Sequence, residues 1–191
     1  MNSCFNMLMV GVGGQGIVLA SDIAAGAALK AGYDVKKSEI HGMSQRGGSV
    51  FSHIRLGEKV FSPVIPERQA DLLVSLEEME VLRWIGYAGK SSRIILSRER
   101  ITPANCPVYP EGTAEFIKSA FSKADILEKE LLVEMAGKPK FINSVILGVS
   151  SVYTPVEEGC WVRAIEELVP AGSAGQNLAA FRNGRALIKE R

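Results

Sequence analysis

The sequence MLMVGVGGQG at residues 7–16 indicates how the chain begins to fold. A short apolar run ends in a glycine-rich turn, and small or apolar residues then recur at helical spacing over residues 15–31. This order is typical of the first strand, first turn and first helix of an α/β domain. A second strand, expected over residues 33–40, would complete a strand–helix–strand unit of the kind that builds parallel sheets.

The glycine turn satisfies the pattern GxGxxG. Its members are Gly11, Gly13, Gly14, Gln15 and Gly16, with Val12 between the first two glycines. In a dinucleotide site such glycines let the backbone approach a pyrophosphate, and the helix N-terminus supplies partial positive charge. Glu39 lies 23 residues after Gly16, close to where such a site places the acidic residue that binds the ribose. The alternative is that the glycines serve turn geometry and helix packing only, with a partner chain over the turn.

A second candidate site is the loop HGMSQRGG at residues 41–48. Arg46 in such a loop could grip a carboxylate or phosphate through two parallel hydrogen bonds. Because the loop follows the second strand, we expect it at the same carboxyl edge as the glycine turn, where α/β proteins bind ligands. The alternative is a loop at the entry to a hairpin, with Arg46 capping carbonyls or pairing across a subunit contact. The candidate residues are His41, Ser44, Gln45, Arg46, Gly47 and Gly48.

The rest of the chain predicts further alternation of strands and helices. Residues 49–56 alternate polar and apolar, and Gly57-Glu58 suits a type II′ turn, so we expect an antiparallel hairpin with residues 59–62. The predicted fold is one α/β domain over residues 1–191, with three α/β/α layers and a mostly parallel, Rossmann-like sheet that carries this added hairpin. Further strands are expected at 70–76 and 93–97, a turn at 89–92, a short extended piece at 106–109, and helices at 77–88, 113–121, 124–136, 141–152, 157–168 and 176–188.

Composition excludes several classes of partner. The 22 basic and 21 acidic residues of the 191-residue chain leave a net charge of +1, so no broad field attracts nucleic acid or anionic lipid. No apolar run approaches the roughly 20 residues of a membrane helix, and no signal-peptide leader is recognisable. The three cysteines are scattered and form no CxxC pair, which argues against a disulfide framework and for a reducing compartment. We therefore expect a cytoplasmic protein that binds neither nucleic acid nor membrane.

The sequence offers no cofactor motif beyond the glycine turn. Iron–sulfur clusters are usually held by close groups of cysteines, which this chain lacks. Its two histidines, His41 and His53, share no metal-ligand spacing with the cysteines. A nucleophile elbow, a P-loop, a paired-carboxylate site and the Gly-Asp-Gly of thiamine diphosphate sites are also absent from the sequence. We therefore expect no catalytic residue, metal or redox cofactor to be held by this chain alone.

The stretch SEIHGMSQRGGSV at residues 38–50, taken with the glycine turn, resembles the gamma-type subunits of 2-oxoacid:ferredoxin oxidoreductases. It is most similar to the small, or beta, subunit of the indolepyruvate ferredoxin oxidoreductases. Between residues 98 and 138 little is recognisable, which leaves the identity of the 2-oxoacid open. The match continues in FSPVIP at residues 61–66, ADLL at 70–73 and QNLAAF at 176–181, and so covers nearly the whole chain.

The resemblance implies a division of labour. Enzymes of this family oxidatively decarboxylate a 2-oxoacid to an acyl-CoA and reduce ferredoxin, using thiamine diphosphate, magnesium, 4Fe-4S clusters and coenzyme A. The cofactors are held by large partner subunits or domains, so this chain would support assembly and shape the approach of coenzyme A or substrate, without activity alone. Two alternatives stand beside this interpretation: a free-standing NAD(P)- or FAD-binding oxidoreductase, and a scaffold subunit without any ligand.

Overall fold

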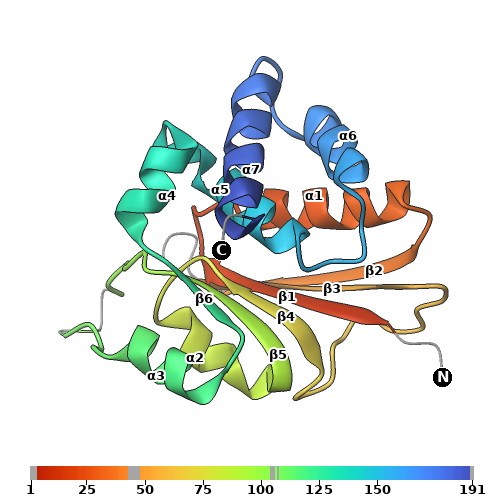
Figure 1. Ribbon diagram of the computed structural model, residues 1–191. Helices are drawn as coiled ribbons and strands as arrows, with labels where there is room; N and C mark the ends of the chain where they lie inside the picture. The colour runs from red at the N-terminus through yellow and green to blue at the C-terminus, as the bar shows by residue number, and fades with distance from the viewer. Residues whose placement is uncertain (1–3, 43–47, 104–105, 107, 190–191) are drawn as a thin grey trace.

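The computed structural model describes residues 4–42, 48–103, 106 and 108–189, and Figure 1 shows their arrangement. Within these ranges, no helix is both long and apolar enough to cross a membrane. The elements are β1 Phe5–Val12, α1 Ile17–Lys30, β2 Asp34–His41, β3 Ser49–Gly57, β4 Ala70–Ser75, α2 Glu80–Trp84, η1 Ile85–Tyr87, β5 Ala88–Ser97, α3 Thr113–Ala120, β6 Ala124–Leu127, α4 Lys129–Ala136, η2 Pro139–Phe141, α5 Ile142–Ser151, α6 Glu158–Leu168 and α7 Ala174–Lys189.

The strands form a mixed sheet in the order β2-β3-β1-β4-β5-β6. β1, β4, β5 and β6 run parallel, whereas β3 is antiparallel to both of its neighbours, β1 and β2. The predicted α/β fold, mostly parallel with an added antiparallel hairpin, is therefore confirmed. The helices pack on both faces of this sheet, as the three-layer prediction requires (Figure 1).

The hairpin has a different partner from the one that the sequence predicts. β3 pairs with residues 34–41, not with residues 59–62, which form no strand. The reason is that β3 inserts between β1 and β2, so both of its edges are already paired. The chain after β3 instead passes the end of the hairpin, where the Val60 amide donates to Asp34 Oδ2 at 2.8 Å. The strands on either side of α1 are consequently separated by β3.

Three other predictions are wrong in their boundaries. Residues 124–136 were expected as one helix, but Ala124–Leu127 form β6 because they pair with the end of β5, and α4 begins at Lys129. Residues 77–88 hold a helix only over Glu80–Trp84, followed by a 3-10 turn. The expected turn at 89–92 lies inside β5. The short extended piece expected at 106–109 forms no strand at its described residues 106, 108 and 109, and its extended conformation stays a prediction.

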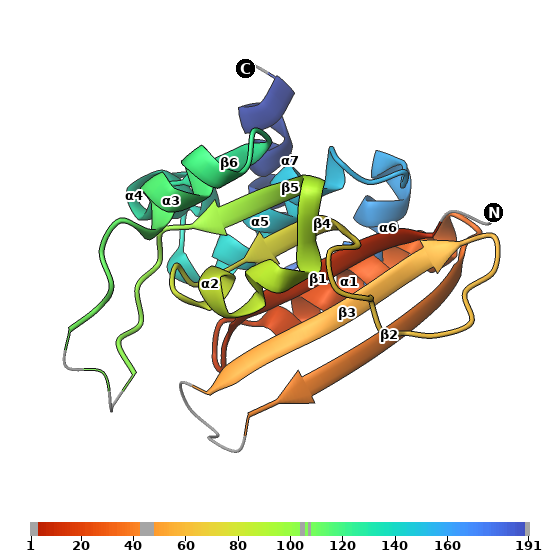
Figure 2. The same ribbon diagram turned by 90° about the horizontal axis from the view of Figure 1, so that it is seen from below.

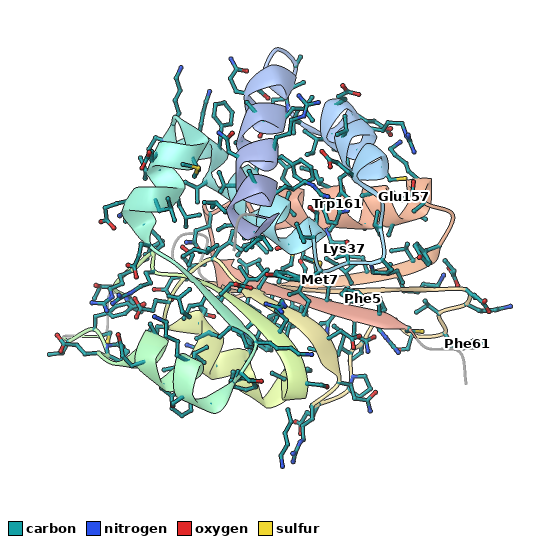
Figure 3. The ribbon with its side chains drawn as sticks, viewed as in Figure 1. Phe5, Met7, Lys37, Phe61, Glu157 and Trp161 are labelled. Atoms are coloured by element: carbon teal, nitrogen blue, oxygen red, sulfur yellow. The ribbon has the colours of Figure 1, made fainter. Side chains whose placement is uncertain are left out.

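Two apolar cores lie on the two faces of the sheet. Met7 and Met9 of β1 face α1 and α4–α7, whereas Leu8 and Val10 face α2 and α3. Figure 3 labels Met7 on β1 and Trp161 on α6, both of which belong to the larger core. Seen from below, α2 lies beside β1 and β4 and α3 lies beside β6 (Figure 2), and Trp84 of α2 packs on Phe51 of β3.

Helices α5 and α7 cross closely, and each has one glycine that lies against the backbone of the other helix. A Cβ on Gly148 would lie 2.0 Å from the Phe181 carbonyl oxygen, and a Cβ on Gly184 would lie 2.0 Å from the Val145 carbonyl oxygen. Both clashes involve backbone, which cannot move aside without separating the helices. Glycine at these two positions therefore fixes the close crossing that seats α5 beside the glycine turn.

We expect Gly148→Ala and Gly184→Ala each to lower the free energy of unfolding by about 3 kcal/mol or more, because the added methyl group overpacks the crossing. Urea denaturation followed by circular dichroism measures the effect. Gly175→Ala, on the same α7 but with open space around it, is the matched control and should change stability by no more than about 1 kcal/mol. Equal losses in all three variants would contradict the close crossing.

Candidate functional site

The glycine turn is shaped by the side chains that pack into it. A Cβ on Gly11 would lie 2.6 Å from both Gln15 Oε1 and Ile17 Cδ1, and a Cβ on Gly16 would lie 2.7 Å from Asn143 Nδ2 of α5. Gly16 has φ 75° and Gly14 has φ 101°, the left-handed region that favours glycine. Turn geometry and close packing therefore account for these three glycines without a bound ligand.

Gln15 joins the ends of two parallel strands. Its Oε1 accepts a hydrogen bond from the Val12 amide at 2.9 Å, and its Nε2 donates to the Leu76 carbonyl at 2.8 Å. The Leu76 amide in turn donates to the Val10 carbonyl at 2.9 Å. The carboxyl ends of β1 and β4 are thus linked by one side-chain amide, which needs both a donor and an acceptor at its tip.

Gly48, at one described end of the polar loop, reaches the glycine turn. The Gly13 amide donates to the Gly48 carbonyl at 2.8 Å, and the Gly42 amide donates to the Ser49 carbonyl at 2.9 Å. The two loops that the sequence singles out therefore meet at the carboxyl edge. The roles assigned to Ser44, Gln45, Arg46 and Gly47 fall outside the described residues, and His41 is described only as the last residue of β2.

Glu39 lies away from the glycine turn. It pairs with Ser52 of β3, which pairs in turn with Met9 of β1, so Glu39 is level with Met9 and two strands away. At a strand spacing of about 4.8 Å this separation is about 10 Å. Lys37 Nζ also holds the Glu39 carboxylate at 2.8 Å. The acidic residue of a dinucleotide site is therefore not beside this turn, because the inserted β3 occupies the position that the second strand takes in such sites.

A cavity of about 570 Å³ opens beside the glycine turn, on the side of α1 that faces α4 and α5. One wall is the turn itself and the start of α1, and the opposite wall is the chain that follows β5. Helix α4, η2 and the start of α5 complete it. The lining residues are Gly14, Gln15, Gly16, Leu19, Leu76, Glu99, Ile101, Lys129, Val133, Pro139, Lys140, Ile142, Asn143 and Ile146.

The cavity combines apolar walls with a small excess of positive charge. Of its charged lining residues, Lys129 Nζ lies 3.0 Å from Glu99 Oε1, and Lys140 Nζ stands 4.9 Å from the centre of the Phe141 ring. Two lysines and one glutamate leave one net positive charge, to which the α1 N-terminus adds its partial charge. Asn143 Oδ1 is buried without a hydrogen-bond partner in the described chain. These features suit a ligand with an anionic group and an apolar part.

The sequence interpretation missed three buried carboxylates at the same edge. Glu77, Glu78 and Glu80 are 0%, 0% and 3% exposed, although the sequence predicts only a helix over residues 77–88 there. Glu78 Oε2 accepts from Arg100 Nε at 2.7 Å, and Glu80 Oε2 accepts from the Ser49 hydroxyl at 2.5 Å. The signal that could have found them is the Arg98 and Arg100 pair at the end of the next parallel strand, because parallel strands end at one edge.

Glu77 is held by neutral donors. Its Oε2 accepts from the amides of Met79 at 2.7 Å and Glu80 at 2.9 Å, and its Oε1 accepts from the Ile101 amide at 3.0 Å and the Tyr109 hydroxyl at 2.5 Å. Burial and the neighbouring Glu77 carboxylate raise the pKa of the Tyr109 phenol well above its ordinary value. The phenol therefore stays protonated and donates its hydrogen bond to Glu77.

Metal-ligating side chains do not gather in the described part of the chain. No group of three or more histidine, cysteine, aspartate or glutamate side chains is placed there to hold a metal ion. The three cysteines are free, and only Cys160 is buried.

The fold places the protein in the α/β class, with a glycine turn and buried carboxylates at the carboxyl edge of a mixed sheet. The chain belongs to the pyruvate ferredoxin/flavodoxin oxidoreductase family, whose model matches residues 6–187. It is 34% identical to the indolepyruvate oxidoreductase subunit IorB of Thermococcus kodakarensis, over 97% of this chain and 96% of that protein. It is thus a homologue of the small subunits of 2-oxoacid:ferredoxin oxidoreductases.

Solved structures share the fold. The gamma subunit of a keto/oxoacid ferredoxin oxidoreductase from Geobacter sulfurreducens superposes with a TM-score of 0.72 at 20% identity, over 98% of this chain and 99% of that one. The 2-oxoglutarate:ferredoxin oxidoreductase from Magnetococcus marinus, determined with 2-oxoglutarate, coenzyme A and succinyl-CoA bound, gives 0.74 at 16% identity. This chain matches only 32% of that longer chain, while all of this chain is covered.

We expect Gln15→Glu to lower the free energy of unfolding by about 1–3 kcal/mol, because a carboxylate can accept from Val12 but leaves the Leu76 carbonyl facing an acceptor. Denaturation in urea at pH 7 measures the loss. Gln176→Glu, at an exposed position of α7, is the control and should be within about 0.5 kcal/mol of the parent chain. A Gln15→Glu variant as stable as this control would contradict the bridging role.

Proposed function

We propose that this chain is the small subunit of an indolepyruvate-type 2-oxoacid:ferredoxin oxidoreductase in the cytoplasm. The observation that carries the proposal is the family match over residues 6–187, together with 34% identity to an indolepyruvate oxidoreductase subunit along nearly its full length. The same continuous match supports treating residues 1–191 as a single domain. The complex would decarboxylate a 2-oxoacid, form the acyl-CoA and reduce ferredoxin.

In this proposal the redox chemistry belongs to a large partner subunit. Thiamine diphosphate, magnesium and the 4Fe-4S clusters would be held there, and ferredoxin would dock on the complex. This chain would complete the assembly through its carboxyl edge, where the glycine turn meets the ends of the polar loop. Its cavity has the size and charge for an anionic substrate group, and coenzyme A, with its phosphates and its apolar pantetheine arm, is the ligand we assign to it.

The two other candidate functions have less support. A free-standing dinucleotide oxidoreductase would need an acidic residue beside the glycine turn, and Glu39 stands two strands away with Lys37 on its carboxylate. A scaffold without any ligand would give no reason for a cavity lined by two lysines and the start of α1. Calorimetric titration of the isolated chain with NAD, NADP and FAD should therefore give no heat of binding.

We expect the purified chain, mixed with its large subunit, to restore oxoacid-dependent reduction of ferredoxin that neither subunit supports alone. The reason is that each subunit lacks part of the assembled site. The rate of ferredoxin reduction with indolepyruvate, pyruvate and 2-oxoglutarate measures both assembly and substrate preference. Full activity of the large subunit by itself would contradict the proposal. A preference for a substrate other than indolepyruvate would show that the proposed substrate class is wrong.

We expect the double variant Lys129→Ala, Lys140→Ala to raise the KM for coenzyme A by about ten-fold, the equivalent of about 1.4 kcal/mol, because it removes the cavity's positive side chains. The kcat and the co-elution of the subunits should not change. The double variant Lys118→Ala, Lys123→Ala is the charge-matched control, because both lysines are exposed and neither lines the cavity. Equal KM values in both double variants would show that the cavity does not bind the coenzyme A phosphates.

A further inference from the structure

The cavity wall opposite the glycine turn has no regular secondary structure of its own. Residues 98–103 follow β5 as irregular chain, and Glu99 and Ile101 of this stretch line the cavity. Arg100 of this wall is held by the Glu78 carboxylate, and two further hydrogen bonds join the wall to the β4–α2 connection (residues 76–79). The Glu78 amide donates to the Glu99 carbonyl at 2.8 Å, and the Ile101 amide donates to Glu77 Oε1 at 3.0 Å. The place of the wall therefore depends on individual groups, not on a helix or strand ladder.

The carboxylate of Glu77 leaves this wall little freedom. A carboxylate offers about four acceptor positions, and all four are taken by the donors at Met79, Glu80, Ile101 and Tyr109. Since the side chain is 0% exposed, water cannot replace a donor that moves away. A shift of Ile101 would leave part of a buried charge without a partner, which is costly.

Tyr109, which follows the irregular stretch 98–103 in the sequence, supplies one of the four donors to Glu77. Its hydroxyl donates to Glu77 Oε1 at 2.5 Å and also accepts from the Met79 amide at 2.8 Å. The guanidinium of Arg100 lies 5.3 Å from the centre of its ring. One phenol thus ties the chain beyond residue 108 to the β4–α2 connection beside the cavity, although neither Tyr109 nor Glu77 lines the cavity itself.

The other wall is held by the same connection. The Leu76 carbonyl accepts from Gln15 Nε2 at 2.8 Å, and Gln15 belongs to the glycine turn. Three consecutive residues, 76–78, therefore contact both walls: Leu76 on the side of the turn, and Glu77 and Glu78 on the side of the irregular chain. One short segment of backbone is thus bonded to both walls of the cavity.

We propose that Glu77, with Tyr109 as its partner, is a positioning residue for the ligand cavity: it fixes the wall at residues 99–101 relative to the glycine turn. The inference rests on the proposed function, because it takes coenzyme A as the ligand of the cavity. Glu77 does not touch that ligand, so its effect is on the shape of the cavity and not on the reacting atoms. A merely structural role would instead lower stability and leave affinity unchanged in the folded complex.

The test measures steady-state kinetics of the reconstituted complex with Tyr109→Phe, Glu77→Gln and, as the matched control, Tyr33→Phe. Tyr33 also donates its hydroxyl to the protein, to the Pro155 carbonyl at 3.1 Å, but outside the cavity. We expect Tyr109→Phe to raise the KM for coenzyme A by about five-fold, the affinity equivalent of one hydrogen bond, and Glu77→Gln to raise it further. The kcat and the co-elution of the subunits should match the parent complex in all three variants. For Tyr33→Phe the KM for coenzyme A should match the parent value as well.

A Tyr109→Phe complex that assembles normally and keeps the parent KM for coenzyme A would overturn the positioning role. Tyr109→Phe decides alone if Glu77→Gln does not fold, because it removes one hydroxyl and no charge. The double variant Lys129→Ala, Lys140→Ala distinguishes a wrong positioning role from a wrong assignment of coenzyme A to the cavity. If they raise the KM and Tyr109→Phe does not, only the positioning role is wrong; if neither raises it, the assignment of coenzyme A to the cavity is wrong as well.

Discussion

A buried carboxylate that has no cationic partner within the described part of the chain constrains the whole carboxyl edge of this protein. Glu77 is 0% exposed, and its hydrogen-bond partners in the described chain are all neutral: three backbone amides and one phenol. Such a group is tolerated only when every acceptor position is used. The start of α2, the chain after β5 and the segment that carries Tyr109 must therefore converge on one point behind β4.

Neighbouring groups extend this convergence to the rest of the edge. Leu76 joins the glycine turn through Gln15, and Glu80 joins the first residue of β3, which follows the polar loop. The loops of four strands, β1, β2, β4 and β5, are thus connected through one short segment. In the proposed function these loops face a larger partner, and positioning them before the partner binds would reduce the freedom that they lose on assembly.

The sequence was sufficient for the fold class and for the convergence of the two loops, because both follow from strand direction. The run from Met7 to the glycine turn, followed by an alanine-rich helix, predicts an α/β unit whatever its neighbours are. The identity of the neighbours was not predictable in this way. Residues 34–41 carry the polar surface of an edge strand, and nothing local indicates that β3 separates them from β1.

The candidate site shows the same limit. The glycine pattern was recognisable, but its physical reason, the packing of Gln15 and Asn143 against Gly11 and Gly16, depends on residues distant in sequence. An acidic run such as residues 77–80 normally forms a solvated helix face. Its burial here depends on Arg100, Ser49 and Tyr109, which three other segments of the chain supply. Tertiary partners of this kind cannot be deduced from local periodicity.

Hydrogen–deuterium exchange of this chain, alone and in complex with its large subunit and coenzyme A, tests the central claim most directly. The claim is that the carboxyl edge, held in place by the β4–α2 connection, is the working surface of a small subunit. The account predicts that protection increases at the glycine turn (residues 11–16) and at residues 98–103 when the complex forms. Protection confined to the opposite end of the sheet, around Phe61 (Figure 3), with no change at these two segments, would contradict it.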